Sequence, residues 1–466
     1  MIKKVYNGSP IFIKKQVNFL LGMIPYEKKL GRDFINTYSF LEESQWWSRP
    51  KLEEYQMEQI KKLLEHAYKN VPYYTSLFNE YGINVKSIQN FNDMRRIPYL
   101  TKDIVRNNLD QLIDKNINKN KIVKVVTGGT TGIPMDFYEA RRVSQEREWA
   151  FISNLWSSRG YDIHKTNKFV YLRGNIPLCG YYEKRGLELI LSSFQLTLKN
   201  MNNYLDLIAK FKPDYIQAYP SSIFILAKYI QDNGIKFQIP SLKAIFCSSE
   251  NLFSFQRRII EEAFSTKVYS HYGHSEKACL AGECEKSTLY HLKSEYGYTE
   301  IINNLDIDVT EEDEIGEIVC TGFNNYIVPF IRYKTNDIAV NTNQTCNCGR
   351  DYKLLKRIEG RKQDFFVDRS GSLISMIKSH SAVRYLKEKI TAYQFVQNVP
   401  GEIILNLEAN TDLNELDYRI ILKEFLEFYP GFRLKIEVID KIPRSNAGKY
   451  RYLVQNIKNE FMKVNG

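Results

Sequence analysis

A glycine- and threonine-rich segment, VTGGTTGIPM at residues 126–135, is the first place where the residue types suggest chemistry. Backbone N–H groups next to glycine, together with threonine hydroxyls, can surround a phosphate. The segment is not a P-loop, because a P-loop ends in Gly-Lys-Ser/Thr and here Ile133 follows Gly132. Taken alone, this composition is more typical of an ordinary turn. The rest of the chain must therefore decide between a turn and a phosphate site.

Two polar clusters in the middle of the chain add groups that suit a nucleotide. SHYGHSEKA (270–278) contains an aromatic–glycine pair against which a planar base can lie, and Glu276, a carboxylate of the kind that Mg²⁺ prefers. In RYKTND (332–337), Asp337 follows a turn and could hold two ribose hydroxyls, as acidic residues do in dinucleotide sites. Alone, each cluster is also what a turn with solvated charges contains.

Two more clusters lie toward the C-terminus. EGRKQD (359–364) places Arg361 directly after a glycine, at a change in sequence texture. IPRSNAGKYR (442–451) places Lys449 on a loop bounded by proline and glycine, from which its charge could reach a phosphate. Taken singly, each is an ordinary surface cation.

In this order along the chain, the five clusters resemble the motifs of the adenylate-forming superfamily, the acyl-CoA synthetases and their relatives. The matching stretches are TGGTTGIP, YGHSE, YKTND, GRKQD and PRSNAGK, and the resemblance runs from about residue 53 to 455. The stretches SQWWSRPKLEEYQ, HAYKNVPYY and IPYLTKDIVRNN look like the phenylacetate–CoA ligase-like branch, which includes proteins associated with capsular polysaccharide synthesis.

The resemblance implies an ATP site with Mg²⁺. Glu276 would bind Mg²⁺, and Lys449 would bridge the carboxylate and α-phosphate oxygens during adenylation. Asp337 would hold the ribose, with Arg361 beside it. The other residues expected around ATP are Thr127, Gly128, Gly129, Thr130, Thr131 and Gly132 over the β- and γ-phosphates, Ser249, Glu250, Tyr272 and Gly273 around adenine, and Ser275 at the α-phosphate.

The acid pocket and the hinge are also carried over from the resemblance. The carboxylic acid would lie near Tyr219, Pro220, Ser221 and Ser222, whose polar character favours a polar or amino acid over a fatty chain. Three positions depart from the usual family pattern: Gly128 replaces serine, Asn336 replaces glycine, and Gln363 stands where the hinge has Asp or Lys. Because Gln363 is the expected pivot between the two half-reactions, acyl transfer is less securely implied than adenylation.

The implied reaction is ATP-dependent activation of a carboxylic acid to an acyl-adenylate, with release of pyrophosphate. Two approaching anions then need Mg²⁺ and a lysine to neutralise their charge. The acyl group would pass to CoA, a carrier-protein thiol or an amine. One alternative is adenylation without CoA, with delivery to a sugar or amine acceptor in capsule assembly. Another is a non-catalytic ATP-binding structural partner, which the presence of both Glu276 and Lys449 disfavours.

A second group of residues suits a structural Zn²⁺ ion. Cys284 and His291 lie in GECEKSTLYH, and Cys346 and Cys348 lie in TCNCGR; three thiolates and one imidazole match a closed zinc shell in type and number. The alternative is a set of unrelated buried cysteines, with Cys279 as a competing ligand. Cys-x-Cys-Gly-Arg also recurs in the phenylacetate–CoA ligase-like branch, some members of which bind zinc there.

The elements that must position these residues alternate along the chain. Apolar spacing predicts helices at 53–70, 141–157, 199–211 and 222–232, and short apolar runs predict strands at 168–172, 215–219, 242–246 and 267–273. This alternation indicates the α/β class, with a large N-terminal domain of layered, mainly parallel β-sheets and helices. Runs at 314–322 and 329–340 indicate a smaller, barrel-like and more antiparallel β subdomain.

The sequence changes character after residue 361. Three strand-like runs surround a helical segment at 416–429, which is typical of a compact α+β unit. We therefore expect an ATP- and acid-binding domain at 1–360 and a small, mobile α+β lid domain at 361–466 that carries Lys449.

Composition limits the remaining classes. The chain has 466 residues and a net charge of +11 that is spread rather than blocked, and it shows no recognised nucleic-acid-binding module. Seven cysteines, an odd number, do not form a disulfide framework, so we expect a reducing cytoplasmic location. No stretch predicts a transmembrane segment. PIFIKKQVNFLLGMIP at 10–25 favours a helix packed on the domain over an interfacial helix, which leaves a peripheral membrane position open, as it does a homodimer.

Overall fold

The computed structural model describes residues 9–24, 26–127, 135–141, 143–175, 177–178, 180–196, 198–361, 365–369, 373–375, 379, 382–383, 385–386, 389–444 and 451–457. Its first part is helical. The helices are α2 (Ile11–Met23), α3 (Tyr26–Ser44), α4 (Arg49–Asn70), α5 (Pro72–Glu80), α6 (Lys102–Asn107) and α7 (Leu109–Leu112), with 3₁₀ turns at Val85–Ser87, Phe91–Arg96 and Lys119–Lys121.

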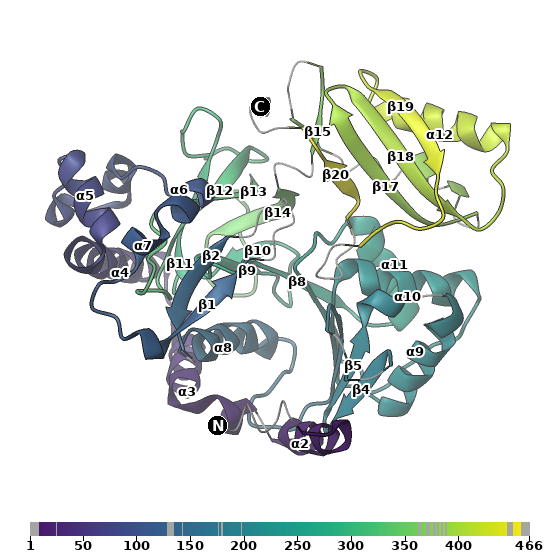
Figure 1. The fold of residues 1–466 in the computed structure, drawn as a ribbon, viewed down its shortest axis with the longest axis horizontal. Coiled ribbons are helices and arrows are strands. Elements are labelled where there is room, and N and C mark those ends of the chain that lie inside the picture. The colour runs from purple at the N-terminus through teal and green to yellow at the C-terminus, as the bar shows by residue number, and fades with distance from the viewer. Residues whose placement is uncertain are drawn as a thin grey trace.

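One sheet of twelve strands runs through the larger part of the molecule (Figure 1). Its strands in spatial order are β11 (Gly297–Ile302), β12 (Ile315–Gly322), β13 (Tyr333–Asn341), β14 (Leu354–Arg361), β10 (Tyr290–Leu292), β9 (Leu280–Gly282), β8 (Val268–Gly273), β7 (Ala244–Ser248), β6 (Tyr215–Ala218), β3 (Phe169–Arg173), β5 (Glu188–Ser192) and β4 (Tyr182–Arg185). The run from β8 to β5 is parallel, and the remaining pairs are antiparallel.

Helices cover both faces of the parallel half. α9 (Leu198–Phe211), α10 (Pro220–Asp232) and α11 (Ser254–Phe264) pack on one face over aliphatic side chains such as Ile216 and Ile245. α3 and α8 (Val143–Ser157) pack on the other face, where Trp156 stacks on Phe246 with ring centroids 4.6 Å apart. A 3₁₀ turn at Ser193–Gln195 follows β5. Strands buried on both faces explain why their sequences read as continuous apolar runs.

A two-stranded hairpin, β1 (Ile122–Val126) and β2 (Asp136–Ala140), forms a separate antiparallel pair. An ion pair from Lys277 Nζ to Glu139 Oε2, at 2.5 Å, fixes β2 beside the turn after β8. Both side chains are largely buried, so the pair is more strongly held than a surface pair would be.

The C-terminal part is a smaller α+β unit, at the upper right of Figure 1. β19 (Arg433–Val438), β18 (Glu402–Ala409), β17 (Ile390–Val399) and β20 (Leu453–Gln455) form its four-stranded sheet, on which α12 (Glu415–Phe428) packs. β15 (Phe365–Val367) pairs with β16 (Leu373–Ser375). The unit meets the larger part where Val367 packs with Ile338, and where Tyr452 contacts α11.

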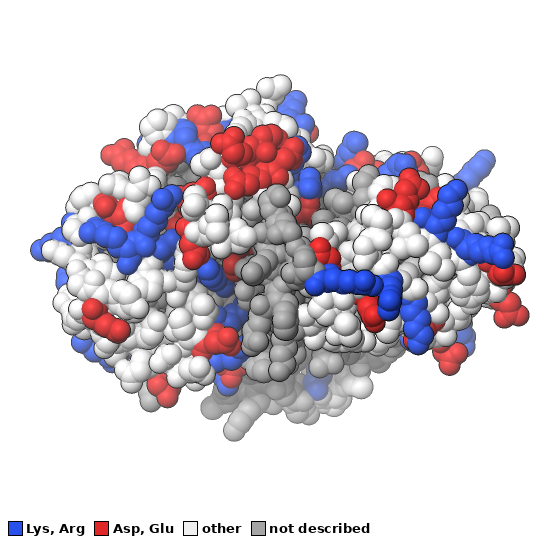
Figure 2. Space-filling model, turned by 90° about the horizontal axis from the view of Figure 1, so that it is seen from above, with Lys and Arg blue, Asp and Glu red and all other residues white. Residues whose placement is uncertain are grey.

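The expected α/β class is confirmed, as is the small α+β unit at the C-terminus. The sheet is less parallel than the sequence predicts, because β9 to β14 continue the parallel strands as one antiparallel extension of the same sheet. The proposed boundary near residue 361 and the mobility of the lid stay predictions. On the face shown in Figure 2, basic and acidic side chains are interspersed.

Candidate functional site

Two of the predicted clusters meet at one hydrogen bond. Tyr272, near the end of β8, donates its hydroxyl to Asp337 Oδ2 in β13 at 2.7 Å. Burial raises the pKa of Tyr272 well above its ordinary value, and the neighbouring charge of Asp337 raises it further. The phenol therefore stays protonated at working pH and is a permanent donor to Asp337.

Local backbone geometry positions Asp337. Asn336, directly before it, has φ of 64°, the left-handed conformation that asparagine tolerates better than most residues. The Asp337 N–H donates to Thr335 Oγ1 at 3.0 Å, and Asp337 lies opposite Arg361 in the β13–β14 register. The asparagine that departs from the expected glycine therefore fits the conformation required here. The third and fourth sequence clusters are neighbours in the sheet.

Each carboxylate oxygen of Glu276 has a polar side chain within hydrogen-bond distance. It is 5% exposed; its Oε1 accepts the Tyr333 hydroxyl at 2.5 Å, and its Oε2 lies 3.1 Å from His274 Nδ1. Burial alone would raise its pKa, but the hydrogen bond and charge of His274, the Tyr333 hydroxyl and the charge of Lys102 outweigh that effect and lower the pKa to about 2. Glu276 is thus an ionised, oriented carboxylate, suited to a divalent cation.

Sequence reasoning missed three side chains around Glu276. Tyr333 and His274 belong to the quoted clusters but were given no role, although they orient the carboxylate directly. Lys102 lies in IPYLTKDIV, a stretch that resembles the family without indicating a role for the lysine; its Nζ donates to Thr335 O at 3.0 Å. A signal was available for the first two, because they sit within two or four residues of predicted ligands.

The segment that suggested a phosphate loop joins β1 to β2. Thr127 and Met135 are bonded in both directions across its base: Thr127 N donates to Met135 O, and Met135 N donates to Thr127 Oγ1, each at 2.9 Å. Gly128, Gly129, Thr130, Thr131 and Gly132 lie outside the described residues, as do Lys449 and Gln363.

The residues expected to line the acid pocket begin α10. Tyr219 precedes the helix, Pro220 opens it, and Ser221 N donates to Glu250 Oε2 at 3.0 Å. A carboxylate at a helix N-terminus is favourable, so Glu250 has a structural task beside its expected place at the nucleotide. Ser221 Oγ and Ser222 Oγ are buried and have no hydrogen-bond partner among the described residues.

The turn after β7 has an unusual backbone. Ser249 has φ of 71° and is exposed, although serine rarely adopts that conformation. Gly273 and Ser275 are likewise exposed at the end of β8. These three residues lie at or just beyond the carboxyl ends of adjacent parallel strands, where open α/β sheets bind ligands.

The C-terminal unit reaches this edge through Tyr452. Its hydroxyl accepts a hydrogen bond from Gln256 Nε2 at 2.9 Å. Its ring packs edge-on against that of Phe253, with the ring centroids 5.6 Å apart. Tyr452 is three residues after Lys449, and Phe253 is three residues after Glu250.

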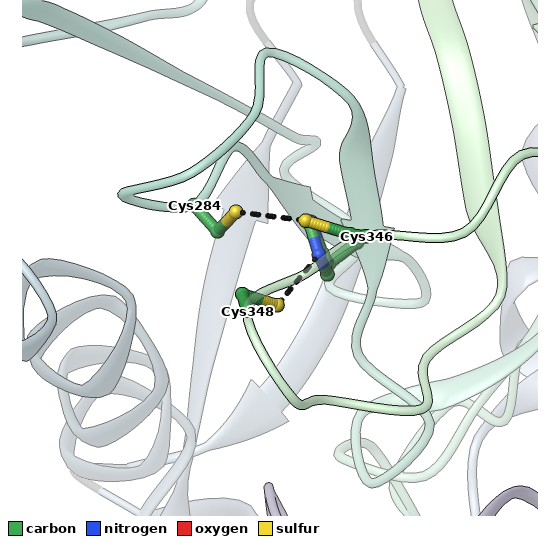
Figure 3. A group of neighbouring side chains, drawn as sticks. Cys284, Cys346 and Cys348 are labelled. Atoms are coloured by element: carbon green, nitrogen blue, oxygen red, sulfur yellow. Dashed lines mark hydrogen bonds between the residues drawn. The ribbon is translucent and has the colours of Figure 1, made fainter.

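The four expected zinc ligands converge. Figure 3 shows the three cysteines pointing toward one another. Cys284 Sγ lies 3.4 Å from Cys346 Sγ, and Cys348 Sγ lies 3.3 Å from His291 Nε2. All four ligand atoms lie within 4.8 Å of one another, which fits a tetrahedral shell with Zn–S bonds of about 2.3 Å. His291 Nδ1 lies 3.1 Å from Leu289 O, which leaves Nε2 to face the thiols.

The competing ligand is excluded by its position. Cys279 is buried in the hydrophobic core and accepts a hydrogen bond from Thr299 Oγ1 at 3.4 Å. It does not belong to the group of four. The six cysteines that the structure describes form no disulfide.

Among the described residues, no helix is both long and apolar enough to span a membrane.

Known proteins with similar sequences or folds include CapK and acyl-CoA ligases. The family described as the CapK C-terminal domain matches residues 366–456. Protein CapK of Staphylococcus aureus is 28% identical over 98% of this chain and 100% of its own length. Phenylacetate-coenzyme A ligase of Thermus thermophilus is 24% identical over 86% and 96%. The structure of a 2-hydroxyisobutyryl-CoA ligase in the postadenylation state superimposes with a TM-score of 0.70 at 18% identity, covering 88% of this chain and 91% of that one.

Proposed function

We propose that this chain activates a polar carboxylic acid as its acyl-adenylate and transfers the acyl group to CoA. It is an AMP-forming ligase of the phenylacetate–CoA ligase-like branch of the adenylate-forming superfamily. The observation that carries the proposal is the bond between Tyr272 and Asp337. It joins two clusters that lie 65 residues apart in the sequence and places an aromatic ring beside a carboxylate, the two groups that a base and a ribose need.

The nucleotide would lie at the carboxyl edge of β8. The Tyr272 ring would stack on adenine while its hydroxyl orients Asp337 toward the ribose. Arg361, opposite Asp337 in the sheet, would stand beside the same hydroxyls. Thr127, at the base of the β1–β2 connection, and the segment 128–132 would meet the β- and γ-phosphates.

The chain's own charges would lower the barrier to adenylation. Glu276, ionised and held by Tyr333 and His274, would hold Mg²⁺, which neutralises phosphate charge when bound. Lys449 would bring a second cation to the acid and the α-phosphate. The contact of Tyr452 with Phe253 supports this role, because it places a near neighbour of Lys449 beside the segment that follows β7. Residues 361–466 would act as the lid, with Gln363 at the pivot.

Unsatisfied polar atoms at the start of α10 favour a polar acid. A buried hydroxyl without a partner is unfavourable, and Ser221 and Ser222 each have one at the start of α10. The Arg173 guanidinium lies 5.6 Å from the centre of the Tyr219 ring, which adds a cation to this corner. A substrate with hydroxyl, amino or additional carboxylate groups would satisfy these atoms, and a long alkyl chain would not.

Product analysis tests the reaction. Incubation with ATP, Mg²⁺ and a panel of aromatic, amino and sugar acids should yield AMP and a hydroxylamine-trappable acyl group, and CoA should convert the product to a thioester. Formation of ADP instead of AMP would contradict the proposal. Adenylate formation that CoA leaves unchanged would point to a carrier protein, a sugar or an amine as acceptor.

We also propose that Cys284, His291, Cys346 and Cys348 bind one structural Zn²⁺. The burial of the cluster supports a structural rather than a catalytic ion, because three of its four members are buried and four protein ligands complete the coordination shell. The purified protein should contain about one zinc per chain. Cys346→Ser should lose it, whereas Cys279→Ser should retain it. Equal zinc content in the two variants would contradict this site.

We further infer a reducing, cytoplasmic environment, which the six cysteines described without a disulfide suit.

A further inference from the structure

Helix α2 (Ile11–Met23) is oriented opposite to an ordinary surface helix. Two of its contacts with the sheet edge are made by an amide and by glycine: Asn18 Nδ2 donates to Glu183 Oε1 at 2.9 Å, and Gly22 packs on the backbone of Arg185. Gly22 O also accepts from Leu187 N at 3.3 Å. A surface helix normally places its apolar stripe against the core, so this contact leaves the apolar residues elsewhere.

Those apolar residues face away from the protein. The exposed fractions are 70% for Phe12, 65% for Leu20 and 43% for Phe19, and the other large apolar side chains of the helix follow the same pattern: Ile11 53%, Ile13 47%, Leu21 52% and Met23 47%. At 100° per residue, Phe12, Phe19 and Met23 fall on one side, and Ile13 and Leu20 are adjacent. Only Gln16, which is also exposed, falls between these two groups. A largely apolar face on a protein surface marks an interaction site.

The charge around the helix indicates what covers this face. Residues 1–26 contain four lysines, Lys3, Lys4, Lys14 and Lys15, and no aspartate or glutamate. Phenylalanine and leucine on one face with lysine beside them are the composition of helices that lie in the headgroup region of a bilayer. Anionic headgroups attract such lysines. A neutral apolar partner would gain nothing from this one-sided charge.

We propose that α2 is an interfacial helix that binds the surface of an anionic lipid bilayer. The apolar side chains enter the boundary between headgroups and acyl chains, and Lys14 and Lys15 stay at headgroup level. The helix lies at the periphery of the molecule beside β4, at the bottom of Figure 1.

A second copy of the chain is the competing occupant, and size argues against it. Thirteen residues of α-helix are about 20 Å long and about 10 Å wide, a face of roughly 200 Å². Stable dimers bury about 800 Å² on each partner. A bilayer has no such minimum, because insertion of a few side chains together with charge attraction is sufficient for reversible binding.

Vesicle flotation of the full chain tests the proposal. Wild type should float with phosphatidylcholine–phosphatidylglycerol vesicles and much less with phosphatidylcholine alone. The triple variant Phe12→Gln, Phe19→Gln, Leu20→Gln should lose at least tenfold in partitioning. Lys14→Gln with Lys15→Gln should lose about as much on anionic vesicles, since each lysine contributes about fivefold.

Two controls complete the experiment. Leu416→Gln, at a residue that is 64% exposed on α12, should float like wild type, and light scattering should give the same mass for wild type and the triple variant without vesicles. Flotation of the triple variant at the wild-type level, or no flotation of wild type, overturns the proposal. If light scattering shows that wild type is a dimer and the triple variant a monomer, the apolar face binds a second copy of the chain. That result also overturns the proposal.

Discussion

The hydroxyl of Tyr272 offers the sharpest separation of structural roles in the site. Tyr272→Phe keeps the ring expected to stack on adenine and removes only the donor to Asp337 Oδ2. A hydrogen bond to a charged group contributes about 1.5–3 kcal/mol, which corresponds to roughly 10- to 100-fold in affinity if all of it serves to orient the carboxylate. Asp337 has further partners, so we expect the lower end, about a tenfold rise in the KM for ATP.

Steady-state kinetics with ATP and acid varied separately measure this effect. The KM for the acid should stay unchanged. Tyr272→Leu, which also removes the ring, should raise the KM for ATP by about a further tenfold, because base stacking on the ring is lost. Tyr74→Phe is the matched control, because it removes another buried hydroxyl, which donates to Pro329 O at 2.8 Å. A normal KM for ATP in Tyr272→Phe, or a rise confined to the KM of the acid, would refute the assignment of Tyr272 and Asp337 to the nucleotide.

Three further predictions concern charge. Glu300→Gln should lower the free energy of unfolding by about 3–5 kcal/mol in urea titrations, because it leaves buried Arg332 without its bidentate partner. The pKa of Glu276 is lowered from 4.5 to about 2 in the folded protein, so its contribution to stability is complete above about pH 4.5 and is lost as pH falls toward 2. The unfolding free energy of Glu276→Gln, measured in denaturant titrations across this pH range, should therefore fall by a few kcal/mol less than that of wild type. Lys449→Ala should abolish adenylation while calorimetry still detects ATP binding.

Exposed pairs provide the control for Glu300→Gln. Glu415 and Arg419 form an ion pair at 2.6 Å with side chains that are 82% and 74% exposed, so Glu415→Gln should change stability by less than about 1 kcal/mol. A comparable loss of unfolding free energy in Glu300→Gln and Glu415→Gln would mean that burial does not determine how much the pair of Arg332 and Glu300 contributes to stability. Normal pyrophosphate exchange by Lys449→Ala would remove that lysine from the reaction.

Much of the fold could be predicted from the sequence, because apolar periodicity is a local property. The expected helix at 199–211 and strand at 215–219 differ from α9 and β6 by one residue at one end each. The continuation of β8 into β9 and β10 could not be predicted, because short strands such as Tyr290–Leu292 carry too few residues for a periodic signal. Their pairing depends on contacts between distant segments.

The site was predictable only as far as residue types reveal it. The four zinc-ligand candidates could be chosen by chemistry, and the structure brings them within 4.8 Å. By contrast, Tyr333 and Glu276 are 57 residues apart, and nothing in either segment indicates that one hydroxyl will meet one carboxylate. The orientation of α2 also escaped prediction. The helix expected to pack on the domain does contact β4, but the sequence did not indicate that Asn18 and Gly22 would make this contact.

Acid-dependent exchange of labelled pyrophosphate into ATP is the most direct test of the reaction. It requires only the adenylation half-reaction, so it does not depend on the acceptor or on Gln363. We predict exchange with at least one acid that carries hydroxyl, amino or additional carboxylate groups, at a rate that falls to background in Lys449→Ala. Exchange supported only by long-chain fatty acids would contradict the polar pocket. ATP binding without exchange for any acid would contradict the ligase activity itself.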